Sequence, residues 1–121
     1  MNPQIIRKLL NKLCRQPKII FPKQNGRIEA PSTQGVYIIR RNNDVLHVGR
    51  TLRGKGGLHQ RLANHLHGSS SFTKTFFKGN GDKLRGRCTF QYLEVPDEGK
   101  RAYVEALAIG TLCPKHIGTG A

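Results

Sequence analysis

The sequence has few acidic residues: seven Asp and Glu stand against 21 Lys and Arg, for a formal net charge of +14. Almost all of the excess lies in residues 1–87, because residues 88–121 carry three basic and four acidic side chains. With so few acids interspersed, a merely solvated basic surface is a poor explanation. The charge instead favours a polyanionic partner, DNA or RNA, with an anionic membrane surface as the weaker alternative.

Cysteine is also scarce, and long apolar runs are missing. Cys14, Cys88 and Cys113 form no CxxC pair and are odd in number, which predicts free thiols in a reducing, cytoplasmic compartment. No apolar run approaches the roughly 20 residues of a membrane-spanning helix, so we expect no membrane protein. The segment "IIRKLLNKL" is interrupted by charge and predicts no secretory signal. No GxxxxGK[ST] sequence is present, which argues against nucleoside triphosphate binding.

The 121 residues are enough for one domain. Apolar spacing predicts a basic helix over 3–15, which would pack on the domain with its basic side toward a ligand, lie on a membrane, or flank DNA. Residues 16–34 contain three prolines and a glycine and are typical of a connection with a short extended piece at "KIIF". The sequence thus divides into a helix and arm, residues 1–33, and a main domain, residues 34–121.

Two β-rich runs, "GVYIIRR" and "DVLHVG", flank a polar turn and predict a hairpin. A three-residue loop would place Tyr37 and His47 on one face of the sheet, whereas a two-residue loop would place them on opposite faces. The pattern alone does not choose between the two registers.

The helical pattern "LHQRLANHL" follows a glycine-rich basic loop at 50–57. Arg61 and His65 lie one turn apart on a line that borders its leucine stripe, where a cleft is expected. A short helix over 71–78, a strand at "RCTFQYLEV" and a last helix that Asp97 caps and Pro114 ends complete an α+β order. Glycines let backbone approach phosphates and cations attract them, so we expect nucleic-acid contacts from Arg50, Thr51, Arg53, Lys55, Lys74, Lys78, Arg85 and Arg87.

Read together, these patterns resemble the GIY-YIG nuclease family. The family takes its name from two short motifs, GIY and YIG. "GVY" at 35–37 corresponds to the first of them, and "HVG" at 47–49 corresponds to the second. "RLANH" matches the family's arginine followed four residues later by histidine, and "VEALAIGTLCP" resembles the helix that carries its glutamate. The resemblance covers roughly residues 34–118. It implies a small GIY-YIG-like α+β domain with a three-stranded mixed sheet flanked by helices.

The resemblance also implies a stand-alone endonuclease of bacterial or phage origin. Its substrate would be double-stranded DNA and its cofactor Mg²⁺ or Mn²⁺. Because one site cuts one strand, double-strand cleavage would require a dimer or two successive encounters. The metal ligand would be Glu105, and the implied catalytic residues are Tyr37, His47, Arg61, His65 and Glu105.

These side chains suit that chemistry. The guanidinium of Arg61 matches phosphate oxygens and would stabilise the charge that accumulates on the phosphate. The carboxylate of Glu105 suits Mg²⁺, a hard cation that keeps several waters. Tyr37 would orient or deprotonate the attacking water. Because a free phenol titrates only near pH 10, His65 would assist as a base that titrates near neutrality.

Two positions depart from the family pattern. His47 replaces the tyrosine of the second motif, and no asparagine follows Glu105, with His116 the only similar side chain nearby. Both departures favour an alternative, a nucleic-acid-binding module that keeps the fold with weakened or lost catalysis. Each candidate residue also has an ordinary interpretation as a strand, helix or surface side chain. A basic RNA-binding protein of ribosomal type would explain the charge but none of the ordered motif positions.

Overall fold

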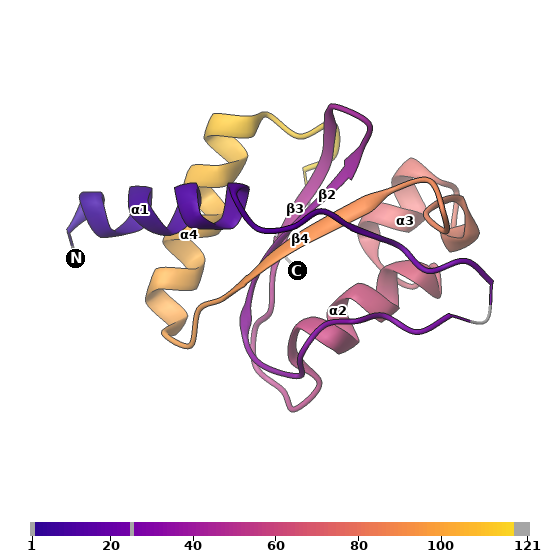
Figure 1. The fold of residues 1–121 in the computed structure, drawn as a ribbon, viewed down its shortest axis with the longest axis horizontal. Helices are drawn as coiled ribbons and strands as arrows, with labels where there is room; N and C mark the ends of the chain where they lie inside the picture. Colours follow the sequence, from indigo (N-terminus) through magenta and orange to yellow (C-terminus); the bar gives the residue numbers. More distant parts are fainter. Residues whose placement is uncertain (1, 25, 118–121) are drawn as a thin grey trace.

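The computed structural model describes residues 2–24 and 26–117, so the last four residues of the predicted domain 34–121 and residues 1 and 25 of the segment 1–33 lie outside the described residues. The division at residue 33 stays a prediction. Along the chain the elements are α1 (Pro3–Cys14), β1 (Ile19–Ile20), β2 (Gly35–Arg41), β3 (Asp44–Arg50), α2 (Gly57–Leu66), α3 (Ser71–Phe76), a 3₁₀ helix η1 (Gly81–Lys83), β4 (Thr89–Glu94) and α4 (Glu98–Leu112) (Figure 1).

The predicted α+β architecture, a sheet flanked by helices, is confirmed. The sheet has four strands in the order β1-β4-β2-β3 rather than the expected three. The extra strand β1 has two residues between Pro17 and Pro22, too few to produce a periodic signal. All three pairings are antiparallel rather than mixed, because α2 and α3 return the chain to the hairpin end of β2 before β4 begins.

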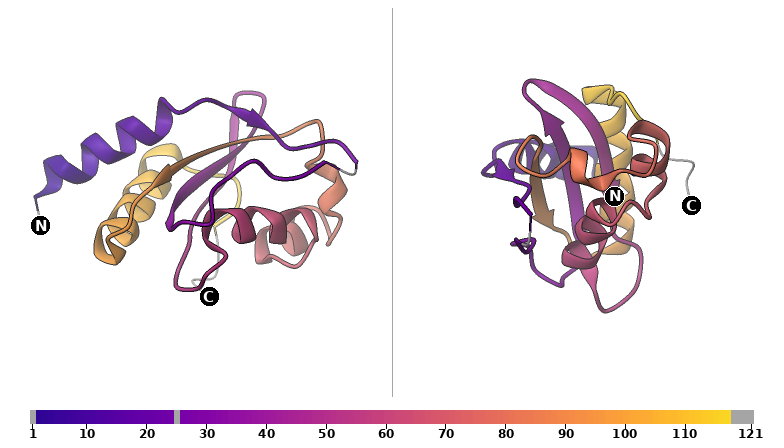
Figure 2. Two further views of the ribbon diagram at one scale, coloured as in Figure 1. Left: turned by 60° about the horizontal axis from the view of Figure 1, so that its bottom comes forward. Right: turned by 90° about the vertical axis from the view of Figure 1, so that its right-hand side faces the viewer.

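Helices lie on both faces of the sheet (Figure 2). One apolar cluster packs on each face. On one face, α2, α3 and the arm pack around Tyr37 and Ile39 of β2. On the other face, α1 and α4 pack on Val36 and Ile38 of the same strand. This alternation follows from the two-residue period of a strand. Tyr37 therefore points toward α2, while α1 and α4 cover the back of the sheet.

The N-terminal helix packs on the domain, one of the three roles that the sequence allowed. Its apolar stripe of Ile6, Leu10 and Leu13 is buried in the cluster with α4. Its C-terminal end is held by Gln91 of β4, whose side-chain amide donates to the carbonyls of Cys14 (3.0 Å) and Gln16 (2.8 Å). The basic side chains of α1 are exposed, and their orientation toward a ligand stays a prediction.

The ends of α4 follow the sequence signals. The Asp97 carboxylate accepts a 2.8 Å hydrogen bond from the backbone N–H of Lys100, as expected of an N-cap. The helix stops at Cys113, whose φ of 48° lies in the left-handed region just before Pro114. All three cysteines are free thiols, as their spacing predicts. Among the described residues, no helix is both long and apolar enough to cross a bilayer.

Candidate active site

Tyr37 and His47 lie on the same face of the sheet. The hairpin turn has two residues, 42–43, a loop that by simple alternation would separate the two side chains onto opposite faces. A β-bulge at Leu46 adds one residue to β3, so that His47 pairs with Ile39, two positions from Tyr37. The bulge therefore brings His47 to the face that carries the phenol, although the turn is short.

The glycine of the second motif provides space for the Tyr37 hydroxyl. Gly49 is the cross-strand partner of Tyr37, and the two lie in adjacent antiparallel strands. A Cβ at position 49 would lie 2.3 Å from the phenol oxygen and 2.5 Å from Cζ, far inside van der Waals contact. Only glycine leaves the Tyr37 ring where it is, which gives a physical reason for the Val-Gly sequence in this strand.

The Tyr37 hydroxyl begins a buried chain of hydrogen bonds. Its oxygen lies 2.7 Å from Nε2 of His65, and the other ring nitrogen of that histidine lies 2.6 Å from Oγ of Ser70. Ser70 Oγ in turn lies 2.9 Å from Oγ1 of Thr73, which lies 2.9 Å from the backbone carbonyl of His65. All four side chains are buried, and Tyr37 and Thr73 have no exposed surface. No bulk water competes for these bonds.

Burial keeps the phenol and the imidazole neutral at pH 7. It raises the pKa of Tyr37 to about 12, while the charge and hydrogen bonding of Arg61 lower that pKa in part and the charge of Glu105 raises it. Burial also lowers the pKa of His65 well below its ordinary value, and the charges of His47 and Arg61 add to this effect. The expectation that His65 titrates near neutrality is therefore wrong, because burial weakens its imidazole as a base. The neutral ring can still accept a hydrogen bond from the neutral phenol at 2.7 Å.

His47 lies in an aromatic cluster next to this pair. Its ring stacks on Phe72, with centroids 4.8 Å apart and planes inclined by 13°, and its Nδ1 lies 3.2 Å from Nδ1 of His116. Burial lowers the pKa of His47 to about 3, with further lowering from the charges of His116 and Arg61. The rings of His47 and Tyr37 are 6.1 Å apart between centroids. His47 is thus a wall of the site, and its catalytic role stays a prediction.

The charged members of the predicted set lie near Tyr37. Arg61 is half-buried one turn before His65, and its Nε has no hydrogen-bond partner among residues 2–24 and 26–117. Glu105 comes from α4 and lies 3.7 Å, Oε1 to Nε, from Arg50 at the end of β3. Burial raises the pKa of Glu105, while the charges of Arg50 and Arg61 lower it in part. The structure therefore brings Tyr37, His47 and His65 together, with ring centroids 5.3–6.1 Å apart. Arg61 and Glu105 are close enough for their charges to shift the pKa of Tyr37.

The predicted nucleic-acid contacts have different surroundings. Thr51 is buried and its hydroxyl accepts a 3.0 Å hydrogen bond from the backbone N–H of Gly35, which closes the end of the sheet. Arg53 is 3.5 Å from Glu98 in an exposed ion pair. The side chains of Lys55, Lys74, Lys78 and Arg87 are exposed. As contacts to a ligand, these residues remain predictions.

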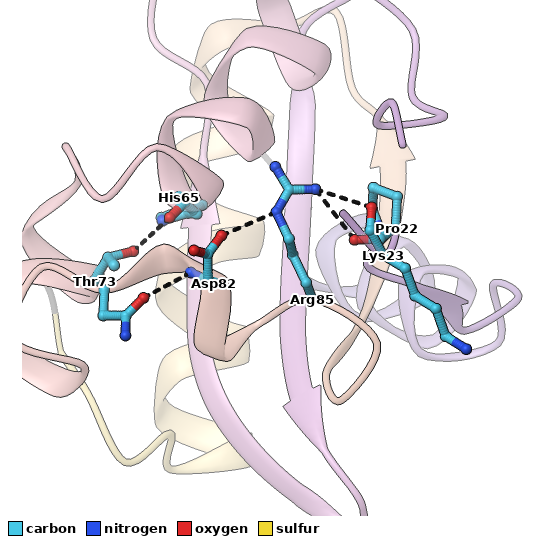
Figure 3. A network of polar contacts seen from close by, with 7 residues as sticks. Pro22, Lys23, His65, Thr73, Asp82 and Arg85 are labelled. Atoms are coloured by element: carbon cyan, nitrogen blue, oxygen red, sulfur yellow. Dashed lines mark hydrogen bonds and ion pairs between the residues drawn. The ribbon is translucent and has the colours of Figure 1, made fainter. Parts of the chain in front are cut away.

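Arg85 is tied into the fold more firmly than the others (Figure 3). Its Nε donates to the Asp82 carboxylate at 3.2 Å, and its Nη1 donates to the carbonyls of Pro22 and Lys23 at 3.3 Å each. These bonds fasten the connecting arm to the loop before β4. Asp82 itself is oriented by a 3.1 Å hydrogen bond from its backbone N–H to Oδ1 of Asn80.

A cavity of about 220 Å³ opens beside Arg61, between α2 and the loop that follows β3. Polar side chains from both elements and from the residue before β2 line it, among them Gln34, Thr51, Arg53, Gln60, Arg61 and Asn64. Arg61 therefore belongs both to this cavity and to the surroundings of the Tyr37 hydroxyl.

Sequence reasoning missed three members of the site. Ser70 and Thr73 reach His65 only because the chain turns at Gly68, whose φ is 76°, and then begins α3. The Ser70 N-cap signal was present, but nothing in it pointed to His65. His116 reaches His47 because its backbone N–H donates to the carbonyl of Leu46 at 2.9 Å, a pairing along the edge of β3.

No protein-family model matches the sequence, and a search of curated proteins finds no match. Solved structures do match. The GIY-YIG N-terminal endonuclease domain of UvrC from Thermotoga maritima, described as bound to magnesium as its catalytic divalent cation, aligns with a TM-score of 0.55 and 20% identity, over 95% of this chain and 97% of that one. A Tyr-to-Phe point mutant of that domain, bound to its catalytic divalent cation, aligns with a TM-score of 0.54 and 20% identity, over 95% of this chain and 96% of that one. An Asn-to-Ala point mutant of the same domain aligns with a TM-score of 0.53 and 20% identity, over 95% of this chain and 96% of that one.

Proposed function

From the GIY-YIG fold that this chain has, as the sequence resemblance implied, we propose a stand-alone, metal-dependent endonuclease that hydrolyses DNA phosphodiester bonds. The observation that carries the proposal is the buried 2.7 Å contact between the Tyr37 hydroxyl and His65 Nε2, next to Arg61. A phenol paired with a neutral imidazole and flanked by a guanidinium is the arrangement that a water attack on phosphate needs.

In this mechanism each side chain has one task. Tyr37 accepts a proton from the attacking water while its own hydroxyl proton passes to Nε2 of His65. The water oxygen forms a bond to phosphorus, and the bond from phosphorus to the leaving 3′ oxygen breaks. Arg61 binds the phosphate oxygens through its guanidinium and stabilises the negative charge that gathers on them. His47 and Phe72 enclose the pair from the side of α3.

Glu105 is the residue that would hold a divalent cation. Among the described residues no three His, Cys, Asp or Glu side chains gather into a metal site, so Glu105 would supply the one protein carboxylate. This fits Mg²⁺ or Mn²⁺, because Mg²⁺ is often held by one or two carboxylates with waters and substrate phosphate completing the shell. When bound, the cation would neutralise charge on the phosphate and the leaving oxygen.

The partner proposed is double-stranded DNA, in a reducing cytoplasm of bacterial or phage origin. Support comes from the net charge of +14 and from exposed cations around the site, including Arg53 and Lys55 in the loop that borders the cavity. Phosphate contacts of this kind dominate nucleic-acid affinity. Cutting both strands would require a dimer or two encounters.

A second candidate is a nucleic-acid-binding module that keeps this fold without efficient catalysis. The observation in its favour is that Tyr37 has no exposed surface and a pKa raised to about 12, which disfavours the phenolate. The histidine in place of the second tyrosine points the same way. Both candidates predict DNA binding, and only the first predicts cleavage.

The test is supercoiled plasmid incubated with the purified protein and Mg²⁺, Mn²⁺ or EDTA. We expect metal-dependent nicking that falls about 100-fold in Glu105→Ala, the loss typical when one group that stabilises developing charge is removed. The matched control is Glu98→Ala, at an exposed carboxylate on the same helix, which should cleave like the wild type. A shift in DNA mobility caused by the wild-type protein, without cleavage in either metal, would favour the binding module. Equal cleavage by wild type and Glu105→Ala would refute the metal assignment.

A further inference from the structure

Each hydrogen bond in the series that runs from Tyr37 through His65 and Ser70 to Thr73 can be assigned a donor and an acceptor. The backbone carbonyl of His65 can only accept, so the 2.9 Å contact with Thr73 uses the Thr73 hydroxyl hydrogen. With that hydrogen committed, the 2.9 Å contact between Ser70 and Thr73 must use the Ser70 hydroxyl hydrogen. Ser70 Oγ can then only accept in its other contacts.

Two donors fill the remaining capacity of Ser70 Oγ. One is the backbone N–H of Thr73 at 3.1 Å, which is the N-cap bond of α3. The other lies 2.6 Å away at Nδ1 of His65, which must therefore carry a hydrogen. A neutral imidazole has one N–H, so Nε2 is left as an acceptor facing the Tyr37 hydroxyl at 2.7 Å.

We propose that Ser70 and Thr73 are positioning residues that hold His65 in the tautomer with its hydrogen on Nδ1, so that Nε2 can accept the proton of Tyr37. The catalytic part of this inference rests on the proposed nuclease function, whereas the tautomer does not. His65 is 1% exposed, Ser70 6% and Thr73 0%, so solvent does not exchange with the hydroxyls and reverse the chain.

The Thr73 hydroxyl sets the direction of the hydrogen bonds between Thr73, Ser70 and His65, because the carbonyl to which it donates can only accept. Without it, the Ser70 hydrogen loses its acceptor, and the nearest alternative is Nδ1 of His65. Ser70 would then donate to that nitrogen, and the imidazole hydrogen would move to Nε2. Nε2–H would donate to the Tyr37 oxygen, and the phenol would no longer have a base for its own proton.

The experiment compares Thr73→Val with Thr75→Val, a matched change at an exposed position on the same helix. The side-chain tautomer of His65 is read from long-range ¹H–¹⁵N correlations of imidazole-labelled protein, with the signals assigned by their loss in His65→Gln. We expect the Nδ1–H tautomer in the wild type and in Thr75→Val, and the Nε2–H tautomer in Thr73→Val. Thr73→Ser keeps the hydroxyl and should restore the wild-type pattern.

Plasmid nicking is measured on the same four proteins. We expect Thr73→Val to cleave about 10–100-fold more slowly, by analogy with the loss of a partner that orients a metal-ligating imidazole, with DNA affinity within about twofold of the wild type. Valine keeps the size and shape of threonine and removes only the two side-chain hydrogen bonds of Thr73, so the variant should remain folded, which circular dichroism checks.

An Nε2–H tautomer or an imidazolium at pH 7 in the wild type would overturn the inference, as would an Nδ1–H tautomer that persists in Thr73→Val. A shifted tautomer in Thr73→Val with wild-type cleavage would overturn the catalytic part. A wild type that shows the expected tautomer and does not cleave in Mg²⁺ or Mn²⁺ would refute the proposed nuclease function and leave the positioning of His65 established.

Discussion

Acidification should destabilise this fold through two buried histidines. Burial lowers the pKa of His47 to about 3 and lowers the pKa of His65 well below its ordinary value. The charged or titratable neighbours of the two rings are His116, Arg61 and Tyr37. The unfolded chain takes up these protons near pH 6.5, so below that pH the unfolded state binds more protons than the folded state. The free energy of unfolding therefore falls as the pH falls from about 7 toward 3.

The size of the effect follows from the difference in proton uptake. At pH 5 a histidine that stays neutral in the fold costs about 2 kcal/mol relative to pH 7.5, so His47 and His65 together cost about 4 kcal/mol. That is a large share of a stability that for domains of this size is on the order of 5–15 kcal/mol. Glu105 acts in the opposite direction, because burial raises the pKa of its carboxyl. A histidine variant is therefore needed to isolate the contribution.

The assay is urea unfolding at pH 7.5 and pH 5.0 for the wild type and His47→Leu. We expect the pH-dependent loss to shrink by about 2 kcal/mol in the variant, since one of the two neutral rings is gone. The control is His67→Leu, at an exposed position outside the cluster, with the wild-type loss expected. The reasoning fails if the wild type and His47→Leu lose the same stability between the two pH values.

Two further changes test the site and the packing behind it. In Gly49→Ala the new Cβ would lie 2.3 Å from the Tyr37 oxygen, so the phenol must move away from His65. We expect plasmid nicking to fall about 100-fold while DNA affinity stays within about twofold of the wild type. Nicking at the wild-type rate would show that the position of the hydroxyl is unimportant. In Gln91→Leu the carbonyls of Cys14 and Gln16 lose their donors, and Arg40 loses the 2.8 Å bond to Oε1. Urea unfolding should show that Gln91→Leu lowers the free energy of unfolding by about 3 kcal/mol, whereas Gln4→Leu, on the exposed side of α1, lowers it hardly at all. Equal stability of the two variants would contradict the proposal that the Gln91 hydrogen bonds hold the end of α1 on the sheet.

Much of the architecture was predictable because its signals are local. The leucine stripe of α2, the Asp97 cap and the Gly-Val-Tyr strand each follow from spacing within a few residues. The line that joins Arg61 and His65 along α2 also predicted a position at the edge of the core, and His65 is buried there while Arg61 is half-buried. These elements depend on periodicity, which one sequence displays directly.

Other features depended on partners that are distant in the sequence. The bulge at Leu46 reversed the consequence of the two-residue turn, because a bulge leaves no signature in alternating apolar residues. The strand β1 exists only through its pairing with β4. The partner of Glu105, Arg50, comes from another layer of the fold, and Ser70 meets His65 through a loop conformation. Such contacts arise from tertiary packing, so spacing along the chain does not display them.

The segment after α4 has a consequence for self-association. β3 is an edge strand, and near its first residues the N–H groups of Lys115 and His116 donate to the carbonyls of Val45 and Leu46 at 3.1 and 2.9 Å. An open edge of this kind is a template on which a second sheet can add by backbone pairing, which leads to aggregates. Here the chain's own C-terminal segment occupies those carbonyls, and the opposite edge, β1, is only two residues long. The fold thus shields the start of β3 from edge-to-edge growth with its own chain and leaves only a very short strand at the other edge.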